Sequence, residues 1–566
     1  MQLKISRLSL SGIVWLAAFL CYGVSAQSFS EHEKQIKQGM DRLQEQIAPL
    51  MKREDVFLQP PGTADTATAV ADENEPCFPV QHIDVSGIAL FSARTVSPLL
   101  RQYENRCLSM TAINTLISRL SGLYLEHGYV TSRAYIGPQD LSDGTLELQV
   151  LEGMAEELRS ADGSISAKQL SLAFPLKPGS HLNLRDIEQG VENLNTLGSN
   201  QVTTELEPGL KQGGSTIMIY NSPSRRWRGS AGLSNTGSDS TGKYQLDANL
   251  VADNLLGVND TVFFSGSGNV GGHDLPQAKS RSYALSWSVP VGYWQVSLLN
   301  NYYEYEQTVV GNVVNFLTHG SSFNSTAQLL HTFYRGQADK LDFSLAFNRK
   351  ESRNYIEDIF LETSSRTLYV WNFGADYLLH LPEGSITAGV QVYHSVPWFG
   401  AKQQLVAAED DFQFTKYQLN LGFSTDFSMG EQPVRYNASL EWLYSREELL
   451  ASEGIAVGGR YSVRGLSDGG LFGYKGGYLR NDFTFPAETG WDVLNQMQWY
   501  WGIDAGITNL PEFSDKGSGW VAGTAIGLRL YDRRFTVNLS YARALRVPDF
   551  LKQKQQEIDF SVRYSF

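Results

Sequence analysis

Residues 454–477 read Gly454-Ile-Ala-Val-Gly-Gly-Arg-Tyr-Ser-Val-Arg-Gly-Leu-Ser-Asp-Gly-Gly-Leu-Phe-Gly-Tyr-Lys-Gly-Gly477. Glycine is too frequent here for a helix or a plain strand, because it loses more backbone entropy on ordering than any other residue. The stretch lies between two segments in which apolar and polar residues alternate, residues 434–445 and the segment that begins at Tyr478. The pattern therefore predicts a long flexible loop between two β-strands.

A single motif, Val463-Arg464-Gly465, places a cation at the centre of this loop. A carboxylate, Asp504, follows on a later strand and precedes Gly506 by two residues. Because an arginine guanidinium is permanently charged and forks onto a carboxylate, it is a suitable anchor for a loop in a polar lumen. We expect the loop to fold back into a β-barrel, where Arg464 pairs with Asp504. The alternative is an ordinary surface arginine and an ordinary pore-facing acid.

The C-terminal part of the chain, residues 223–566, is predicted to be a transmembrane β-barrel. From about residue 227 helical periodicity disappears and apolar residues alternate with polar ones. About sixteen antiparallel strands are expected, an even number as in bacterial barrels. A soluble sandwich would also alternate, but a closed barrel with lipid outside and water inside fits this length better. The last strand ends at Phe566 and resembles a membrane-insertion signal, so barrel-assembly machinery and outer-membrane lipid are expected partners.

The composition narrows the functional classes. A net charge of −14 argues against a nucleic-acid partner. The chain is rich in glycine (52), phenylalanine (28), tyrosine (27) and tryptophan (11), as in a barrel with aromatic girdles. A large secreted β-protein has a similar composition, which alone does not separate the two.

The N-terminus has the features of a secretory signal peptide, residues 1–26. Lys4 and Arg7 precede an apolar core at 13–20, and Ala26 ends a run of small residues. No later stretch reaches the apolar length of a membrane helix. The mature chain is therefore expected either to be soluble outside the cytoplasm or to cross a membrane as strands.

Residues 27–53 are predicted to form an amphipathic helix, followed by a linker at 54–76 that has little to bury. A narrow apolar seam with charged residues on the other faces is typical of a plug, a partner helix or a coiled-coil strand, and all three remain open at this point. The seam follows 4-3-4-3 spacing: Ile36, Met40, Leu43, Ile47 and Leu50.

Two modules with the order β-α-α-β-β are predicted at residues 77–153 and 154–222. Each would have a three-stranded sheet with an edge strand that can accept an extended peptide. Cys77 and Cys107 form an even pair, consistent with one disulfide in an oxidising compartment, and the alternative is two buried thiols. The disulfide would tie the first strand of the module to the end of its first helix.

The whole chain resembles the outer-membrane transporters of two-partner (type V) secretion, the haemolysin-secretion and filamentous-haemagglutinin transporter family. This family belongs to the superfamily of barrels that carry periplasmic POTRA domains. The superfamily loop marker is Val-Arg-Gly followed by tyrosine or phenylalanine, and Leu466 departs from it here. The segments that carry the resemblance are Cys77-Phe78, Cys107-Leu108, Gly128-Tyr129-Val130-Thr131-Ser132-Arg133-Ala134, Pro138-Gln139-Asp140-Leu141, Leu182-Asn183-Leu184-Arg185-Asp186, Glu207-Pro208-Gly209, Val463-Arg464-Gly465 and Gly502 to Gly506.

The resemblance implies a pore that binds a large unfolded exoprotein, such as an adhesin or cytolysin, through the POTRA domains and exports it to the cell surface. The helix at 27–53 would plug the pore at rest, and the chain would act as a monomer. A barrel-assembly or insertion factor of the same superfamily is the alternative, whereas a diffusion porin leaves residues 77–222 unexplained. No enzymatic activity or cofactor is expected, because the nine histidines have no metal-ligand spacing. The segment Gly266-Ser-Gly268-Asn-Val-Gly271 has the glycine spacing of a dinucleotide-binding fingerprint. No plausible helix follows it, so we do not interpret it as a nucleotide site.

Overall fold

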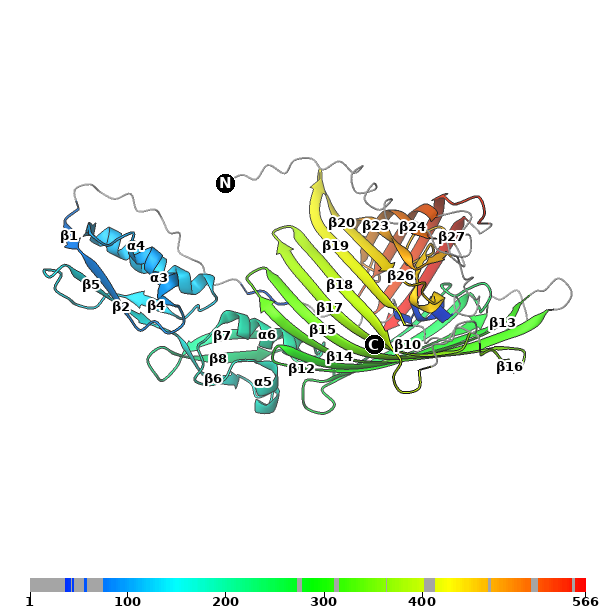
Figure 1. The fold of residues 1–566 in the computed structure, drawn as a ribbon, viewed down its shortest axis with the longest axis horizontal. Helices are drawn as coiled ribbons and strands as arrows, with labels where there is room; N and C mark the ends of the chain where they lie inside the picture. Colours follow the sequence, from blue (N-terminus) through cyan, green and yellow to red (C-terminus); the bar gives the residue numbers. More distant parts are fainter. Residues whose placement is uncertain are drawn as a thin grey trace.

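The computed structural model consists of two small modules followed by a barrel, in chain order along its longest axis (Figure 1). The signal peptide predicted at 1–26 lies outside the described residues, as do Ile47 and Leu50 of the predicted helix. Within the described parts, no helix combines the length and apolarity needed to span a membrane. The structure describes residues 36–41, 43–44, 55–58, 75–271, 277–309, 315–362, 364–401, 413–466, 470–509, 518–551 and 555–566.

The first module has a three-stranded sheet in the order β2-β5-β4, in which β2 and β5 are parallel, and two helices. Its core includes Leu116, Leu120 and Tyr124 of α4, which are fully buried. The prediction omitted a second, two-stranded sheet, in which β1 pairs with β3. The elements are β1 (Cys77–Val80), β2 (His82–Ser86), α3 (Ala93–Leu100), β3 (Arg106–Ser109), α4 (Met110–Glu126), β4 (Arg133–Tyr135) and β5 (Thr145–Leu151).

The second module has the predicted β-α-α-β-β order, with its sheet arranged β6-β8-β7. Ser166 caps α5 in a reciprocal capping box with Gln169, and Asn183 caps α6. The core lies between the helices and the sheet. The elements are β6 (Met154–Ser160), α5 (Ala167–Ala173), α6 (Leu184–Asn195), β7 (Val202–Pro208) and β8 (Gly214–Asn221).

The rest of the chain forms a closed antiparallel barrel, which confirms the predicted sixteen strands. One further short strand, β16 (Ile359–Phe360), extends β15 in a connecting loop. The sixteen strands are β9 (Trp227–Ser234), β10 (Tyr244–Asp253), β11 (Thr261–Gly271), β12 (Lys279–Val291), β13 (Trp294–Val309), β14 (Phe316–Arg335), β15 (Asp339–Ile356), β17 (Arg366–Leu381), β18 (Gly384–Val396), β19 (Thr415–Met429), β20 (Gln432–Ser445), β23 (Lys475–Glu488), β24 (Gln496–Asn509), β25 (Ser518–Tyr531), β26 (Phe535–Arg546) and β27 (Gln556–Ser565).

Side chains alternate between the two faces of the barrel wall. In β10, Leu246 and Leu250 are exposed on the outer face, whereas Asp247 and Asn249 are buried on the lumen side. This arrangement suits apolar lipid outside and a polar lumen. Closure is made by β27 and β9, and the C-terminal Phe566 exchanges both backbone hydrogen bonds with Gly229. The terminal residue thus completes the sheet at the seam.

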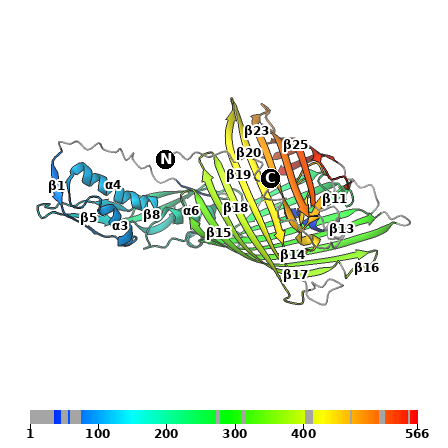
Figure 2. The same cartoon turned by 45° about the horizontal axis from the view of Figure 1, so that its top comes forward.

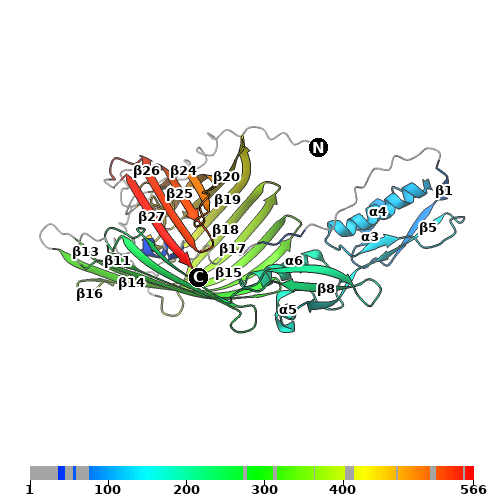
Figure 3. The same ribbon diagram turned by 180° about the vertical axis from the view of Figure 1, so that it is seen from behind.

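The glycine-rich stretch folds back into the barrel between β20 and β23, as its buried residues and wall contacts show. It is not a structureless loop, because β21 (Ile455–Val457) and β22 (Leu471–Gly473) pair as a short hairpin. Its last residues already belong to β23, which begins at Lys475. Figures 2 and 3 show the barrel strands around the dark blue helical segment of residues 36–41 and 43–44.

Candidate functional site

The centre of the site is a buried ion pair between the loop and the barrel wall. Arg464 Nε lies 2.6 Å from Asp504 Oδ2, and Arg464 Nη2 lies 2.7 Å from Asp504 Oδ1. The backbone N–H of Arg464 also donates to Asp504 Oδ2 at 3.1 Å. Both residues are almost completely buried. The structure therefore brings together the two residues that the sequence paired, in the bidentate geometry that arginine favours.

A second carboxylate completes the contacts of the guanidinium. Asp482 Oδ1 on β23 accepts from Arg464 Nη1 at 2.6 Å, and the Tyr500 ring lies 6.0 Å from the guanidinium carbon. The sequence analysis missed Asp482. The alternation of β23 could have revealed it. Asp482 pairs in register with Gly502, which lies two residues before Asp504 on β24, so both aspartates face the lumen.

Glycines give the loop the close approach that this pairing needs. Gly465 has φ +95°, a conformation that L side chains rarely adopt. A Cβ on Gly506 would lie 2.4 Å from Val457 and 3.0 Å from Val463, which is fully buried. A Cβ on Gly502 would lie 2.1 Å from the Arg464 guanidinium. The glycines beside Asp504 thus make room for the loop.

Two further charged residues, Glu453 and Arg460, tie the loop to other parts of the wall. Glu453, fully buried before the hairpin, lies 2.7 Å from Lys350 of β15 and 2.8 Å from Lys416 of β19. Arg460 lies 2.6 Å from Asp559 of β27. Together with Arg464, these contacts attach the loop to three separate regions of the barrel. The residue that departs from the family marker, Leu466, is buried in the loop's apolar cluster with Val463.

The described part of the N-terminal helix lies inside the barrel. Ile36 and Met40 pack against Tyr303 and Tyr305 of β13, both inward-facing and buried. Leu43 packs in a separate cluster with lumen residues of β11 and β12. The three described residues of the predicted seam thus face the wall, which suits a plug better than a coiled-coil strand.

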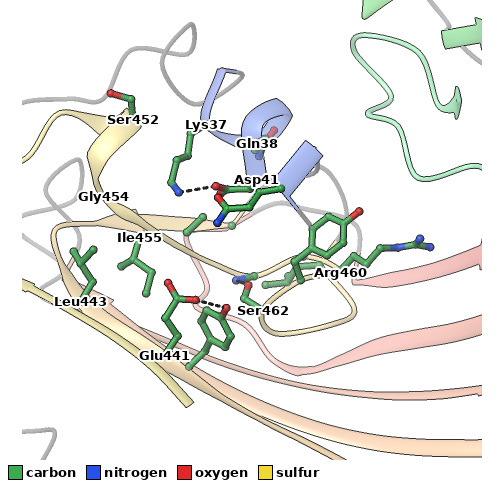
Figure 4. Close-up of a pocket in the computed structure, with 18 of the residues that line it drawn as sticks. Lys37, Gln38, Asp41, Glu441, Leu443, Ser452, Gly454, Ile455, Arg460 and Ser462 are labelled. Atoms are coloured by element: carbon green, nitrogen blue, oxygen red, sulfur yellow. Dashed lines mark hydrogen bonds and ion pairs between the residues drawn. The ribbon is translucent and has the colours of Figure 1, made fainter. Parts of the chain in front are cut away.

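Polar side chains of the helix face the loop across a cavity of about 390 Å³ (Figure 4). Lys37 and Asp41 form an ion pair at 2.7 Å on this face. Opposite them lie Glu441, Arg460 and Ser462, from the barrel wall and the loop. The helix therefore makes its apolar contacts with the wall and presents a polar face to the loop.

The two modules share a hydrogen-bonded junction at Glu152. This buried carboxylate accepts from Ala89 N, Leu90 N and the Tyr124 hydroxyl, each at 2.9 Å, and lies 3.0 Å from His181 of the second module. Burial alone would raise the pKa of Glu152, but these donors outweigh it and hold the pKa below its ordinary value. The junction therefore depends on an ionised carboxylate.

Cys77 and Cys107 form a disulfide with a Cα–Cα distance of 5.3 Å. Contrary to the expectation, Cys107 is not at the end of the first helix. It lies in β3, which pairs with β1. Its register partner is Pro79, two residues from Cys77, so the disulfide joins two neighbouring strands diagonally. Among the described residues, no group of three or more His, Cys, Asp or Glu side chains is arranged to hold a metal ion.

Comparison with known proteins identifies the family. Residues 213–530 match the family model described as haemolysin secretion/activation protein ShlB/FhaC/HecB. Residues 78–153 match a POTRA domain of the ShlB type, and residues 155–208 match a POTRA domain.

Curated relatives match over most of their length. The outer membrane transporter CdiB of Dickeya dadantii is 28% identical and covers 98% of this chain and 99% of its own. The hemolysin transporter protein ShlB of Serratia marcescens is 30% identical, and the match covers 85% of this chain and 84% of that protein. Among solved structures, CdiB from Escherichia coli superposes with a TM-score of 0.84 at 27% identity, over 96% of this chain and all of that one. The chain belongs to the haemolysin secretion/activation family and is an outer-membrane transporter of the two-partner secretion type with periplasmic POTRA domains.

Proposed function

We propose that this transporter exports one large, unfolded partner protein, which its POTRA domains recognise in the periplasm. The observation that carries the proposal is a barrel whose lumen holds two elements that are not part of its wall, the helical segment of residues 36–41 and 43–44 and the anchored loop, next to two modules with edge strands. The edge strands β2, β4, β6 and β7 offer backbone groups that suit an extended chain. Partner folding outside the cell would supply the driving force.

The polar contacts of the loop suit a pore that opens and closes. Ion pairs made by Glu453, Arg460 and Arg464 hold the loop to the wall, beside the apolar contacts of Val463 and Leu466. We propose that Arg464 and Asp504 anchor the loop with help from Val463, Gly465 and Gly506. The helical segment, with its seam from Ile36 to Leu43, would be the plug that leaves during transport.

The test compares the proteins of the culture medium and outer membrane of the native host with and without this gene. Loss of one large exported protein, restored by the wild-type gene, is the expected result. An insertion factor of the same superfamily would instead deplete many barrels together, and that outcome would overturn the proposal. Complementation with Arg464→Ala then asks whether the anchor is needed for export.

A further inference from the structure

Residues 55–58 occupy a groove at the periplasmic end of the barrel. One wall of the groove is α6 of the second POTRA domain, and the other is formed by Arg335 and Lys340, which flank the turn between β14 and β15. The segment lies in the linker between the plug and the first POTRA domain. It is therefore bound by both the barrel and a POTRA domain, although it belongs to neither.

The groove holds the segment by its main chain. Leu58 N donates to Glu188 Oε1 at 2.6 Å, and Val56 N donates to Glu192 Oε2 at 3.4 Å. The carbonyl oxygen of Val56 accepts from Arg335 Nη2 at 2.7 Å. Donors at alternate residues on one side are the pattern of an extended chain that is recognised without regard to its sequence.

The side chains of the segment point alternately to the two sides. Val56 and Leu58 pack against the apolar core of the second POTRA domain. The Phe57 ring lies 4.6 Å from the His380 ring of β17 and 5.4 Å from the Arg335 guanidinium carbon. The groove thus offers apolar contacts to alternate residues of an extended peptide, and a histidine ring and a guanidinium to the residue between them.

The charged groups of the groove are tied to one another by ion pairs. Arg335, Glu188 and Glu192 are each 1% exposed or less, and Arg335 contacts both carboxylates, at 3.4 and 2.6 Å. Lys340 adds a contact to Glu192 at 3.1 Å. Burying this many charges is costly unless each has good partners. Two carboxylates held so close to a main chain are preorganised acceptors for its N–H groups.

We propose that this groove is a binding site for extended polypeptide, and that residues 55–58 fill it at rest as a stand-in for the exported chain. The inference rests on the proposed function for the identity of its natural ligand. An exported segment with apolar residues at alternate positions would displace the linker at the mouth of the pore. Displacement would free the linker, and with it the helix at 36–44, to leave the lumen.

The test uses the full-length transporter in nanodiscs with Val56→Pro and Leu58→Pro, which remove both main-chain donors and both apolar side chains of the segment and so release it from the groove. The probe is a fluorescent peptide of residues 53–60, Arg-Glu-Asp-Val-Phe-Leu-Gln-Pro, followed by anisotropy. Two N-methylated forms remove chosen donors. Methylation at Val56 and Leu58 is expected to weaken binding at least tenfold. Methylation at Phe57, whose N–H has no hydrogen bond within the described residues, is expected to change binding less than threefold.

Protein variants give an independent measurement. Glu192→Gln in the same proline background is expected to weaken binding of the unmodified peptide at least tenfold, whereas the matched change Glu205→Gln, on an exposed edge strand of the same domain, leaves binding unchanged. If the two methylated peptides bind equally well, or if the unmodified peptide does not bind, the groove is not a binding site for extended polypeptide. The binding assay needs no export. If the transporter binds the peptides as predicted but exports no protein, the proposed function is wrong, whereas the peptide-binding site is still supported.

Discussion

Replacing Arg464 with alanine is predicted to release the loop from the barrel wall. The change leaves Asp504, which is fully buried at its side chain, without its bidentate partner, and it removes one contact of Asp482. Removing one partner of a buried pair costs about 3–5 kcal/mol. We take the lower bound of about 3 kcal/mol, which corresponds to roughly a hundredfold shift toward the undocked loop.

Thiol labelling measures this shift directly. Ser462, two residues before Arg464, is 5% exposed and is replaced conservatively by cysteine. In the Ser462→Cys background, Arg464→Ala is expected to raise the rate of maleimide labelling from the outside about a hundredfold, since labelling follows the population of the undocked state. Export of the partner is expected to fall strongly while heat-modifiable barrel stays at its normal level.

The matched control is Arg529→Ala. Arg529 lines the same part of the lumen, but it is exposed and its Nε donates to Asn538 at 2.8 Å. Its loss is expected to change labelling less than threefold. Unchanged labelling and normal export in Arg464→Ala, at normal barrel abundance, would refute the anchor.

Three further predictions concern the plug and the POTRA domains. Gly39→Val is expected to unseat the plug and raise bilayer conductance several-fold, because a Cβ there would lie 2.3 Å from the Tyr303 ring; wild-type conductance would contradict this. The depressed pKa of Glu152 gives stability that is present above the ordinary value of 4.5 and is lost as pH falls through the folded-state pKa. Glu152→Gln should therefore lower the urea midpoint of the POTRA domains at pH 7 and flatten its acid dependence. Replacing Cys77 and Cys107 with serine, which opens a loop with a sequence separation of 30, should cost roughly 3–4 kcal/mol of first-domain stability in urea titrations; an unchanged midpoint would contradict it.

The features that sequence predicts best here are those set by local periodicity. The alternation of Leu246 with Asp247 gives the two faces of a strand directly, and the repeated pattern gives the strand number. The paired strands β1 and β3 were missed because each has only four residues, too few for a period to show. Asp482 was missed because its role depends on which strands are neighbours and in which register.

Contacts between distant parts of the chain were not predictable in the same way. Arg335 lies 147 residues from Glu188, and no local pattern marks either residue as a partner of the other or of Val56. Their association depends on how the second POTRA domain docks on a barrel turn. Arg464 and Asp504 were paired in advance because a shared motif records that contact, whereas the loop's other anchor, Glu453, has no such marker.

The most direct test of export uses purified transporter in sealed vesicles that contain no other protein and no nucleotide. The unfolded partner identified in the host is added on the side of the POTRA domains, and protease protection reports its passage through the membrane. The account predicts that the partner crosses and folds on the far side, and that Arg464→Ala vesicles with the same amount of inserted barrel pass far less. If wild-type vesicles with correctly inserted barrels pass no partner, this chain is not the export pore.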